Sequence, residues 1–175
     1  MPHTIRTERL LLRPPVLRDA RGYAAVMNDR AVTVSTGTWP YPVSEAYARF
    51  RIREAMKADR GTDALWMIVS AGRVVGSLIL SRRRGPEHGV GYSIGRAWWG
   101  QGLATEATRA ACQHAFRAGR AERLWADVFQ DNPGSIRVLE KLGFVRAADP
   151  GPGWSATRSA NFPRHAYTLT RGGLR

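Results

Sequence analysis

The stretch Trp98–Glu106, with the sequence WWGQGLATE, decides both the fold class and the type of site. It follows a short apolar run and precedes a long run of small and apolar residues with helical spacing. Gly100 and Gly102 lie where that helix is predicted to begin, and glycine permits a tight turn and a close approach of the backbone to a ligand. The first amides of a helix have no intrahelical acceptor and carry the positive end of the helix dipole. The sequence therefore predicts a phosphate or pyrophosphate site at residues 100–105.

The composition is that of one packed domain, which we expect to span residues 1–175. Hydrophobic residues make up 43% of the chain, and six tryptophans add buriable area. No apolar run approaches the roughly 20 residues that a membrane span needs. The first six residues also lack the apolar run of a signal peptide, so we expect a cytoplasmic protein. The single cysteine, Cys112, lies in a helical pattern and is predicted to be a buried structural thiol.

The net charge of +13 arises from 27 basic and 14 acidic residues. Such a surface attracts polyanions and is screened by salt, so nucleic acid, an acidic protein and a phosphorylated cofactor are all compatible with it. A nucleic-acid-binding module is the weaker interpretation, because the sequence has no helix-turn-helix or zinc pattern and no platform of aromatic and basic residues. The four histidines show no metal-ligand spacing, so no metal is expected.

Apolar periodicity and turn residues predict alternating strands and helices. The predicted strands cover 9–13, 65–69, 74–80, 90–94, 124–129, 144–145 and 165–170. The predicted helices cover 17–27, 44–57, 103–118 and 133–142, and Asn132 is expected to cap the last of them. The segments 29–42 and 149–164 are predicted to be irregular. This order indicates one mixed α/β domain.

Two motifs and the element order resemble the GNAT superfamily of N-acetyltransferases. The segment Gly91–Ala107 resembles its acetyl-CoA signature, and Asn132–Ser135 with Leu139–Phe144 resembles its second motif. The opening Thr7–Arg13 is similar to the first strand of the branch that contains the bacterial ribosomal-protein N-terminal acetyltransferases. The resemblance covers nearly the whole chain and is specific for the superfamily, but not for an acceptor.

The resemblance implies a fold and a place for acetyl-CoA as co-substrate. It implies a central, mostly antiparallel sheet with helices on both faces, in which the fourth and fifth strands, 90–94 and 124–129, splay apart. The pantetheine arm would enter the gap beside Ser93 and Ile94, with Asn132 on the other side. Trp99 either packs under the glycine loop or contacts the ligand. The pyrophosphate would meet the amides of Gly100, Gln101, Gly102, Leu103, Ala104 and Thr105.

Direct attack of an amine on a thioester requires a neutral amine, donors for the oxyanion and a proton for the leaving thiolate. Family analogy assigns the oxyanion to the backbone N–H near Ile94. Many relatives carry a tyrosine where this chain has Leu139, and Ser135 lies one turn earlier. We expect Ser135 to hold or protonate the sulfur. The alternative is that Ser135 only supports the first turn of its helix.

The general base is less well defined by the sequence. Relatives commonly carry a glutamate where this chain has Val90. Glu87, His88 and Asp127 are candidates that would act through water, although a solvated turn is the competing interpretation for the first two. Tyr92 is either a base or a wall of the acetyl site.

The missing glutamate bears on the choice of acceptor. An α-amine has a pKa of about 7.7–8.0, whereas a lysine amine, at about 10.4, needs roughly 4 kcal/mol for deprotonation at pH 7.5. We therefore expect an α-amine or another low-pKa amine. The acceptor classes left open are a ribosomal protein N-terminus, another protein, a peptide, a polyamine and an aminoglycoside-like molecule. A non-catalytic acyl-CoA-binding regulator is the alternative function, and a monomer and a homodimer are both compatible with the sequence. Trp39, Tyr41 and Trp154 are candidates for the acceptor wall, and the competing interpretation is that each belongs to the core or covers it.

Overall fold

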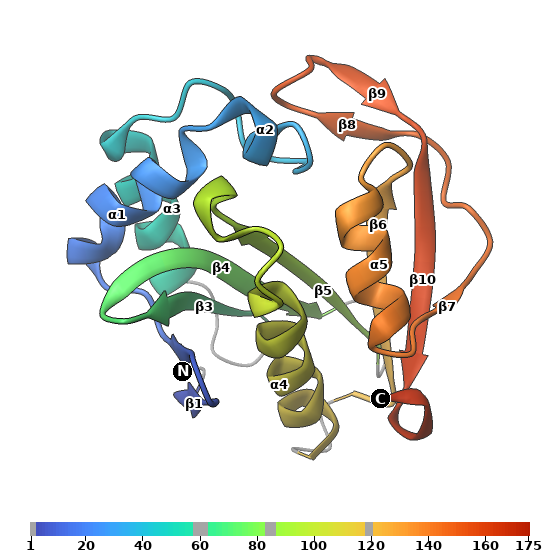
Figure 1. Ribbon diagram of the computed structural model, residues 1–175. Coiled ribbons are helices and arrows are strands. Elements are labelled where there is room, and N and C mark those ends of the chain that lie inside the picture. Colours follow the sequence, from blue (N-terminus) through green and yellow to red (C-terminus); the bar gives the residue numbers. More distant parts are fainter. Residues whose placement is uncertain (1–2, 58–62, 83–86, 118–120) are drawn as a thin grey trace.

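The computed structural model describes residues 3–57, 63–82, 87–117 and 121–175 (Figure 1). Within these residues, one eight-stranded sheet has the order β1-β2-β3-β4-β5-β6-β10-β7. Its pairs are antiparallel except for β5 and β6, which are parallel. The strands are β1 (Ile5–Arg6), β2 (Leu11–Arg13), β3 (Asp63–Ser70), β4 (Arg73–Arg82), β5 (Glu87–Ile94), β6 (Arg123–Phe129), β7 (Val145–Arg146) and β10 (Arg164–Thr170).

Helices cover both faces of the sheet, as predicted. They are α1 (Ala20–Met27), α2 (Arg30–Thr33), α3 (Glu45–Lys57), α4 (Leu103–Arg117) and α5 (Pro133–Lys141). Successive side chains of a strand point to opposite faces. In β3, Trp66 and Ile68 belong to the cluster that includes α4 and α5, whereas Met67 and Val69 belong to the cluster of α1 and α3. Residue 118, where the third predicted helix ends, lies outside the described residues.

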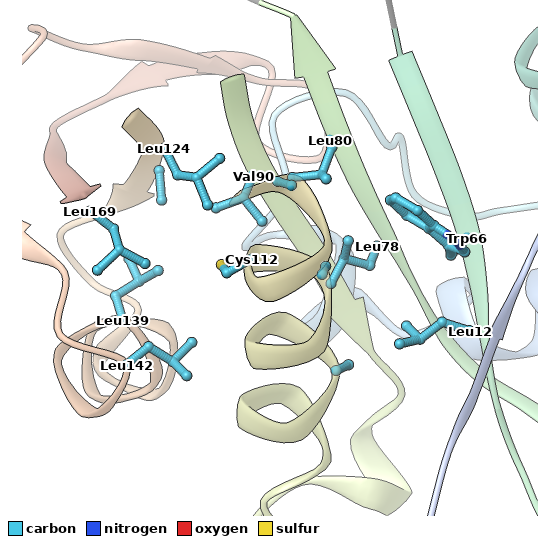
Figure 2. Packing of buried hydrophobic residues seen from close by; sticks show 14 of the residues in the cluster. Leu12, Trp66, Leu78, Leu80, Val90, Cys112, Leu124, Leu139, Leu142 and Leu169 are labelled. Atoms are coloured by element: carbon cyan, nitrogen blue, oxygen red, sulfur yellow. The ribbon is translucent and has the colours of Figure 1, made fainter. Parts of the chain in front are cut away.

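Small side chains let α4 lie close to the sheet. Ala107, Ala111 and Ala115 are buried on its inner face, and so is Cys112, which confirms the prediction of a buried thiol. Figure 2 shows α4 between the leucines of α5 and β10 on one side and those of β2 and β4 on the other. The close packing fixes the position of the N-terminus of α4 relative to β5.

Two segments that were predicted to be irregular contain regular structure. The segment 29–42 includes α2, whose first turn is capped by the Asp29 side chain, which accepts a hydrogen bond from the Ala31 N–H at 2.8 Å. The segment 149–164 contains a hairpin of β8 (Gly153–Ser155) and β9 (Ala160–Phe162). Both elements are too short to show an apolar period, and for this reason the prediction was wrong there.

Candidate active site

The two central strands β5 and β6 part from each other, as predicted. They pair at Glu87–Gly89 and Arg123–Trp125, and the described residues show no pairing between them beyond that point. On their outer sides, β5 stays paired with β4 as far as Ile94, and β6 stays paired with β10 as far as Phe129. The outer pairing holds the two strands apart and leaves a cleft of about 1160 Å³ between them.

The glycine loop borders this cleft at the N-terminus of α4. Gly100 and Gly102 have φ values of 76° and 77°, in the region that favours glycine. The Glu106 N–H donates to the Gly102 carbonyl at 3.0 Å, so the amides of the preceding turn have no intrahelical acceptor. The loop residues that line the cleft are Gly100, Gly102, Leu103, Ala104 and Thr105. Gln101 does not line it, and its side-chain amide donates to the Ala97 carbonyl at 3.1 Å.

The N-terminal segment holds the glycine loop in place. The Glu106 carboxylate accepts hydrogen bonds from the Thr7 hydroxyl at 2.6 Å and from the Arg9 Nε at 2.7 Å. The Arg9 guanidinium also donates to the Gln101 carbonyl at 2.8 Å. Burial alone would raise the pKa of Glu106, but the donors on Thr7 and Arg9 outweigh it and lower the pKa. These partners lie almost a hundred residues apart in the chain, and no local sequence signal indicates the contact.

Trp99 connects the glycine loop to the end of β5. Its indole N–H donates to the Ile94 carbonyl at 2.7 Å, while the side chain stays exposed and lines the cleft. The indole therefore fastens the loop and also presents a ring surface to whatever enters the cleft.

Tyr92 and Ser135 meet on one face of the parted strands. The Tyr92 and Ser135 hydroxyl oxygens are 2.7 Å apart and join β5 to α5. Asn132 begins α5 by accepting a hydrogen bond from the Ser135 N–H at 3.1 Å. Burial raises the pKa of Tyr92 to about 12, so its phenol is protonated at neutral pH. The sequence singled out all three residues but gave no signal for the contact between the two hydroxyls.

A second set of hydroxyls lies on the opposite face of β5. The Ser93 and Ser77 hydroxyl oxygens are 3.0 Å apart, and the Tyr23 hydroxyl oxygen is 2.8 Å from that of Ser77. Burial raises the pKa of Tyr23 to about 12. All three residues line the cleft, which therefore opens on both faces of the sheet. Sequence reasoning missed Tyr23 and Ser77 because they lie in ordinary helix and strand patterns.

The carboxylate candidates fall in different places. Glu87 does not line the cleft, because it belongs to the paired end of β5, where its carboxylate lies 3.5 Å from the Arg123 guanidinium. His88 does not line the cleft either. Asp127 of β6 does line it. The position of Glu87 thus gives no support to the catalytic role predicted for it.

The aromatic candidates for the acceptor wall also differ in whether they line the cleft. Trp39 is buried and lines the cleft, with the Arg51 guanidinium 4.8 Å from its ring centroid. Tyr41 and Trp154 are exposed and do not line the cleft. In the part of the chain that the structure describes, no group of three or more histidine, cysteine or acidic side chains could hold a metal, and no helix is long and apolar enough to cross a membrane.

The family follows from a comparison with family models. The model described as an acetyltransferase (GNAT) domain matches residues 9–145. The chain belongs to the GNAT acetyltransferase family. This GNAT acetyltransferase is 29% identical over 148 residues to the protein named "Uncharacterized N-acetyltransferase p20" of Bacillus licheniformis, covering 82% of this chain and 83% of that protein.

Two further comparisons involve ribosomal-protein acetyltransferases. Over 57 residues, 33% of this chain and 29% of the relative, the GNAT acetyltransferase is 40% identical to the [ribosomal protein uS5]-alanine N-acetyltransferase of Escherichia coli. A solved structure of RimL, the ribosomal L7/L12 α-N-protein acetyltransferase, in complex with coenzyme A superposes with a TM-score of 0.84. It is 19% identical, and the match covers 96% of this chain and 98% of RimL, so it shows the shared fold.

Proposed function

We propose that this GNAT enzyme transfers an acetyl group from acetyl-CoA to the α-amine of a protein or peptide, or to another low-pKa amine. The observation that carries the proposal is the contact between the Tyr92 and Ser135 hydroxyls, at 2.7 Å, inside the cleft that the glycine loop borders. It supports a site in which a proton donor lies next to the place where a thiolate would form. We also infer that residues 1–175 form one domain, because a single sheet includes both β1 and β10.

The binding of acetyl-CoA rests on groups from both sides of the cleft. The amides of Gly100 and of residues 102–105, which line the cleft, would bind the pyrophosphate at the positive end of α4, and Trp99 would border it. The pantetheine arm would run along Ser93 and Ile94, with Asn132 on the opposite wall. The fit is supported by the size of the cleft and by the positions of Gly100 and Gly102 in its lining.

The chemistry then follows from the hydroxyl pair. The lone pair of the amine nitrogen forms a bond to the carbonyl carbon, and the N–H near Ile94 stabilises the oxyanion. The C–S bond breaks, its electron pair goes to sulfur, and the Ser135 hydroxyl gives the sulfur a proton. Because the pKa of Tyr92 is raised to about 12, its phenol stays protonated and donates to the Ser135 oxygen during this step.

The preference for an α-amine rests on the absence of a glutamate at position 90 of β5. The position of the family's usual glutamate holds Val90, which is buried in the core. An amine with a pKa of about 7.7–8.0 is partly neutral at physiological pH, whereas a lysine amine is not. RimL, an α-N-protein acetyltransferase of ribosomal L7/L12, and the N-acetyltransferase of an alanine in ribosomal protein uS5 support the same class of acceptor.

A competition between two matched peptides tests the proposal. One peptide carries a free α-amine and no lysine. The other has an acetylated N-terminus and differs in sequence only by one internal lysine. We expect release of the coenzyme A thiol with the first at a kcat/KM at least tenfold higher than with the second. Faster turnover of the lysine peptide would overturn the choice of acceptor. Binding of acetyl-CoA without thiol release from any amine would instead favour an acyl-CoA-binding regulator.

A further inference from the structure

Asp127 lies on the cleft side of β6, away from the core. The neighbouring side chains Leu124, Ala126 and Val128 are buried in the cluster that contains α4 and α5. Because side chains alternate along a strand, Asp127 points to the opposite face, where it lines the cleft. Its side chain is 21% exposed, so the carboxylate is partly shielded but reachable from the cleft.

The register of the strands places a glycine opposite Asp127. Gly89 of β5 is paired with Trp125 of β6, and the same parallel register continued by two residues sets Gly91 across the gap from Asp127. Gly91 lines the cleft without a side chain, and a Cβ at this position would lie 3.3 Å from the Ile79 Cγ2. A substrate that enters on this face therefore meets backbone on β5 and a carboxylate on β6.

Arg164 holds the Asp127 carboxylate from β10. The two residues come from adjacent antiparallel strands, and the Arg164 Nη1 lies 3.5 Å from the Asp127 Oδ2. The Arg164 Nε donates to the Gly151 carbonyl at 3.3 Å. A Cβ at Gly153 of β8 would clash with the Arg164 side chain, so the glycine leaves the room that this arginine occupies. The guanidinium is thus fixed by backbone on one side and by the carboxylate on the other.

We propose that Asp127 accepts the proton of the incoming acceptor amine and that Arg164 is its positioning residue. The inference rests on the proposed acetyl transfer and assigns the base that Val90 does not supply. It also separates the two proton transfers in space. Tyr92 and Ser135 supply a proton to the sulfur on one face of β5, and Asp127 accepts a proton from the amine on the other face.

The acceptor enters as an ammonium and gives one proton to the Asp127 carboxylate, which later passes it to solvent. The nitrogen lone pair forms the C–N bond, and the second proton leaves the nitrogen for water as the C–S bond breaks. The sulfur takes the electron pair of that bond and a proton from Ser135, which regains one from solvent through Tyr92. Overall, ammonium and thioester give amide, thiol and one released proton.

Two other carboxylates line the cleft but are placed differently. Glu54 of α3 is 49% exposed and pairs with Lys57 at 2.9 Å. Asp131 is 55% exposed and pairs with Arg158 at 2.8 Å, beyond the end of β6. Asp127 is less than half as exposed as either and is the one of the three that lies on a strand bordering the gap. We expect the other two to affect recognition of the acceptor more than the proton transfer.

The test is the pH dependence of Asp127→Asn with the α-amine peptide. We expect kcat/KM at pH 7 to fall about tenfold, because only about a tenth of an α-amine with a pKa near 8 is neutral at that pH, while the affinity for acetyl-CoA stays within twofold. The deficit should shrink as the pH rises through the pKa of the amine, because the neutral acceptor then needs no base. Asp127→Glu should recover part of the activity. The exposed Glu122, just before β6, supplies the control Glu122→Gln, which should match the wild type.

Arg164 provides the second arm of the experiment. Arg164→Met should lower kcat/KM at pH 7 about threefold. This loss should also disappear at high pH, and Arg164→Lys should restore part of the activity. A merely structural role would lower activity equally at every pH. Asp127→Asn within twofold of the wild type at pH 7, or equally impaired across the pH range, would overturn the inference and leave the proposed acetyl transfer intact. A wild-type enzyme with no turnover of any amine would overturn both.

Discussion

The two ends of the β5–β6 pair differ in what their polar side chains do. At the paired end, Glu87 and Arg123 form a 3.5 Å ion pair whose side chains are 32% and 50% exposed. Such a surface pair contributes at most about 1 kcal/mol to stability. At the parted end, Tyr92 and Ser135 share a 2.7 Å contact inside the cleft. The two ends of one strand thus differ in position: polar side chains at the paired end lie at the surface outside the cleft, and those at the parted end line the cleft.

The largest expected effect comes from removing the hydroxyl at the parted end. Ser135→Ala should lower kcat with the α-amine peptide by roughly 100-fold, because the thiolate loses its proton donor. The affinity for acetyl-CoA, measured by calorimetry, should change less than threefold. Ser44→Ala is the matched serine control, because Ser44 caps α3 through the Tyr47 N–H at 3.1 Å and lies away from the cleft.

The control variant should lose about 1 kcal/mol of unfolding free energy and no activity. If Ser135→Ala loses stability like Ser44→Ala but keeps its kcat, Ser135 only supports the first turn of α5. Ser135 would then have a structural role only, although it lies at the parted end of the strands.

A second prediction compares two variants of β5, one at the parted end and one at the paired end. Tyr92→Phe should lower kcat about tenfold, because the Ser135 oxygen loses the partner that replaces its proton. Glu87→Gln should stay within twofold of the wild type, because Glu87 does not line the cleft. The kcat of both variants is measured by steady-state kinetics at pH 7.5. A large loss in Glu87→Gln with an unaffected Tyr92→Phe would reverse the assignment of the two ends.

A third prediction compares two glycines with the same backbone conformation. Gly100 and Gly72 both have a φ of 76°, and a Cβ would have no neighbour within 4 Å at either position. Replacing either by alanine should lower the unfolding free energy by about 1 kcal/mol, because both variants force a residue with a Cβ into the left-handed region. Calorimetry should show at least a tenfold loss of acetyl-CoA affinity for Gly100→Ala alone, because Gly72 lies in the β3–β4 turn. Equal affinities in the two variants would mean that the loop at residues 100–105 does not bind the pyrophosphate.

Local signals explain which parts of this molecule were predictable. The glycine loop, the cap at Asn132 and the small-residue face of α4 are each encoded within a few residues, so the sequence predicted the start of both helices. The helices on both faces of the sheet were implied by the family resemblance. The splayed strands came from the family resemblance, since nothing local in β6 says where its pairing with β5 ends. For the same reason Glu87 was a plausible base in the sequence and lies outside the cleft in the structure.

Contacts between distant segments explain the rest. Arg164 reaches Asp127 across 37 positions, and Thr7 reaches Glu106 across 99. The β8–β9 hairpin, whose Gly153 packs against Arg164, has no apolar period and was predicted to be irregular. The sequence named Asp127 as a candidate base but gave no signal for its contact with Arg164 or for that of Thr7 with Glu106, because only tertiary packing brings these residues together.

The smallest expected effect concerns Cys112, and it tests whether this residue belongs to the core or to the cleft. Cys112 of α4 is fully buried, and burial raises the pKa of its thiol from 9.0 to about 12. Between these values the unfolded chain releases the thiol proton and the folded chain keeps it, so the unfolding free energy falls as the pH rises above 9. Tyr23 and Tyr92, raised from 10.0 to about 12, add to this fall only above pH 10. In Cys112→Ala the fall should therefore begin about one pH unit later, a difference of about 1 kcal/mol at pH 10 in urea unfolding. Its kcat should match the wild type, because a thiol on the core side of Tyr92 has no part in the transfer. A loss of kcat with an unchanged pH dependence of stability would move Cys112 from the core into the cleft.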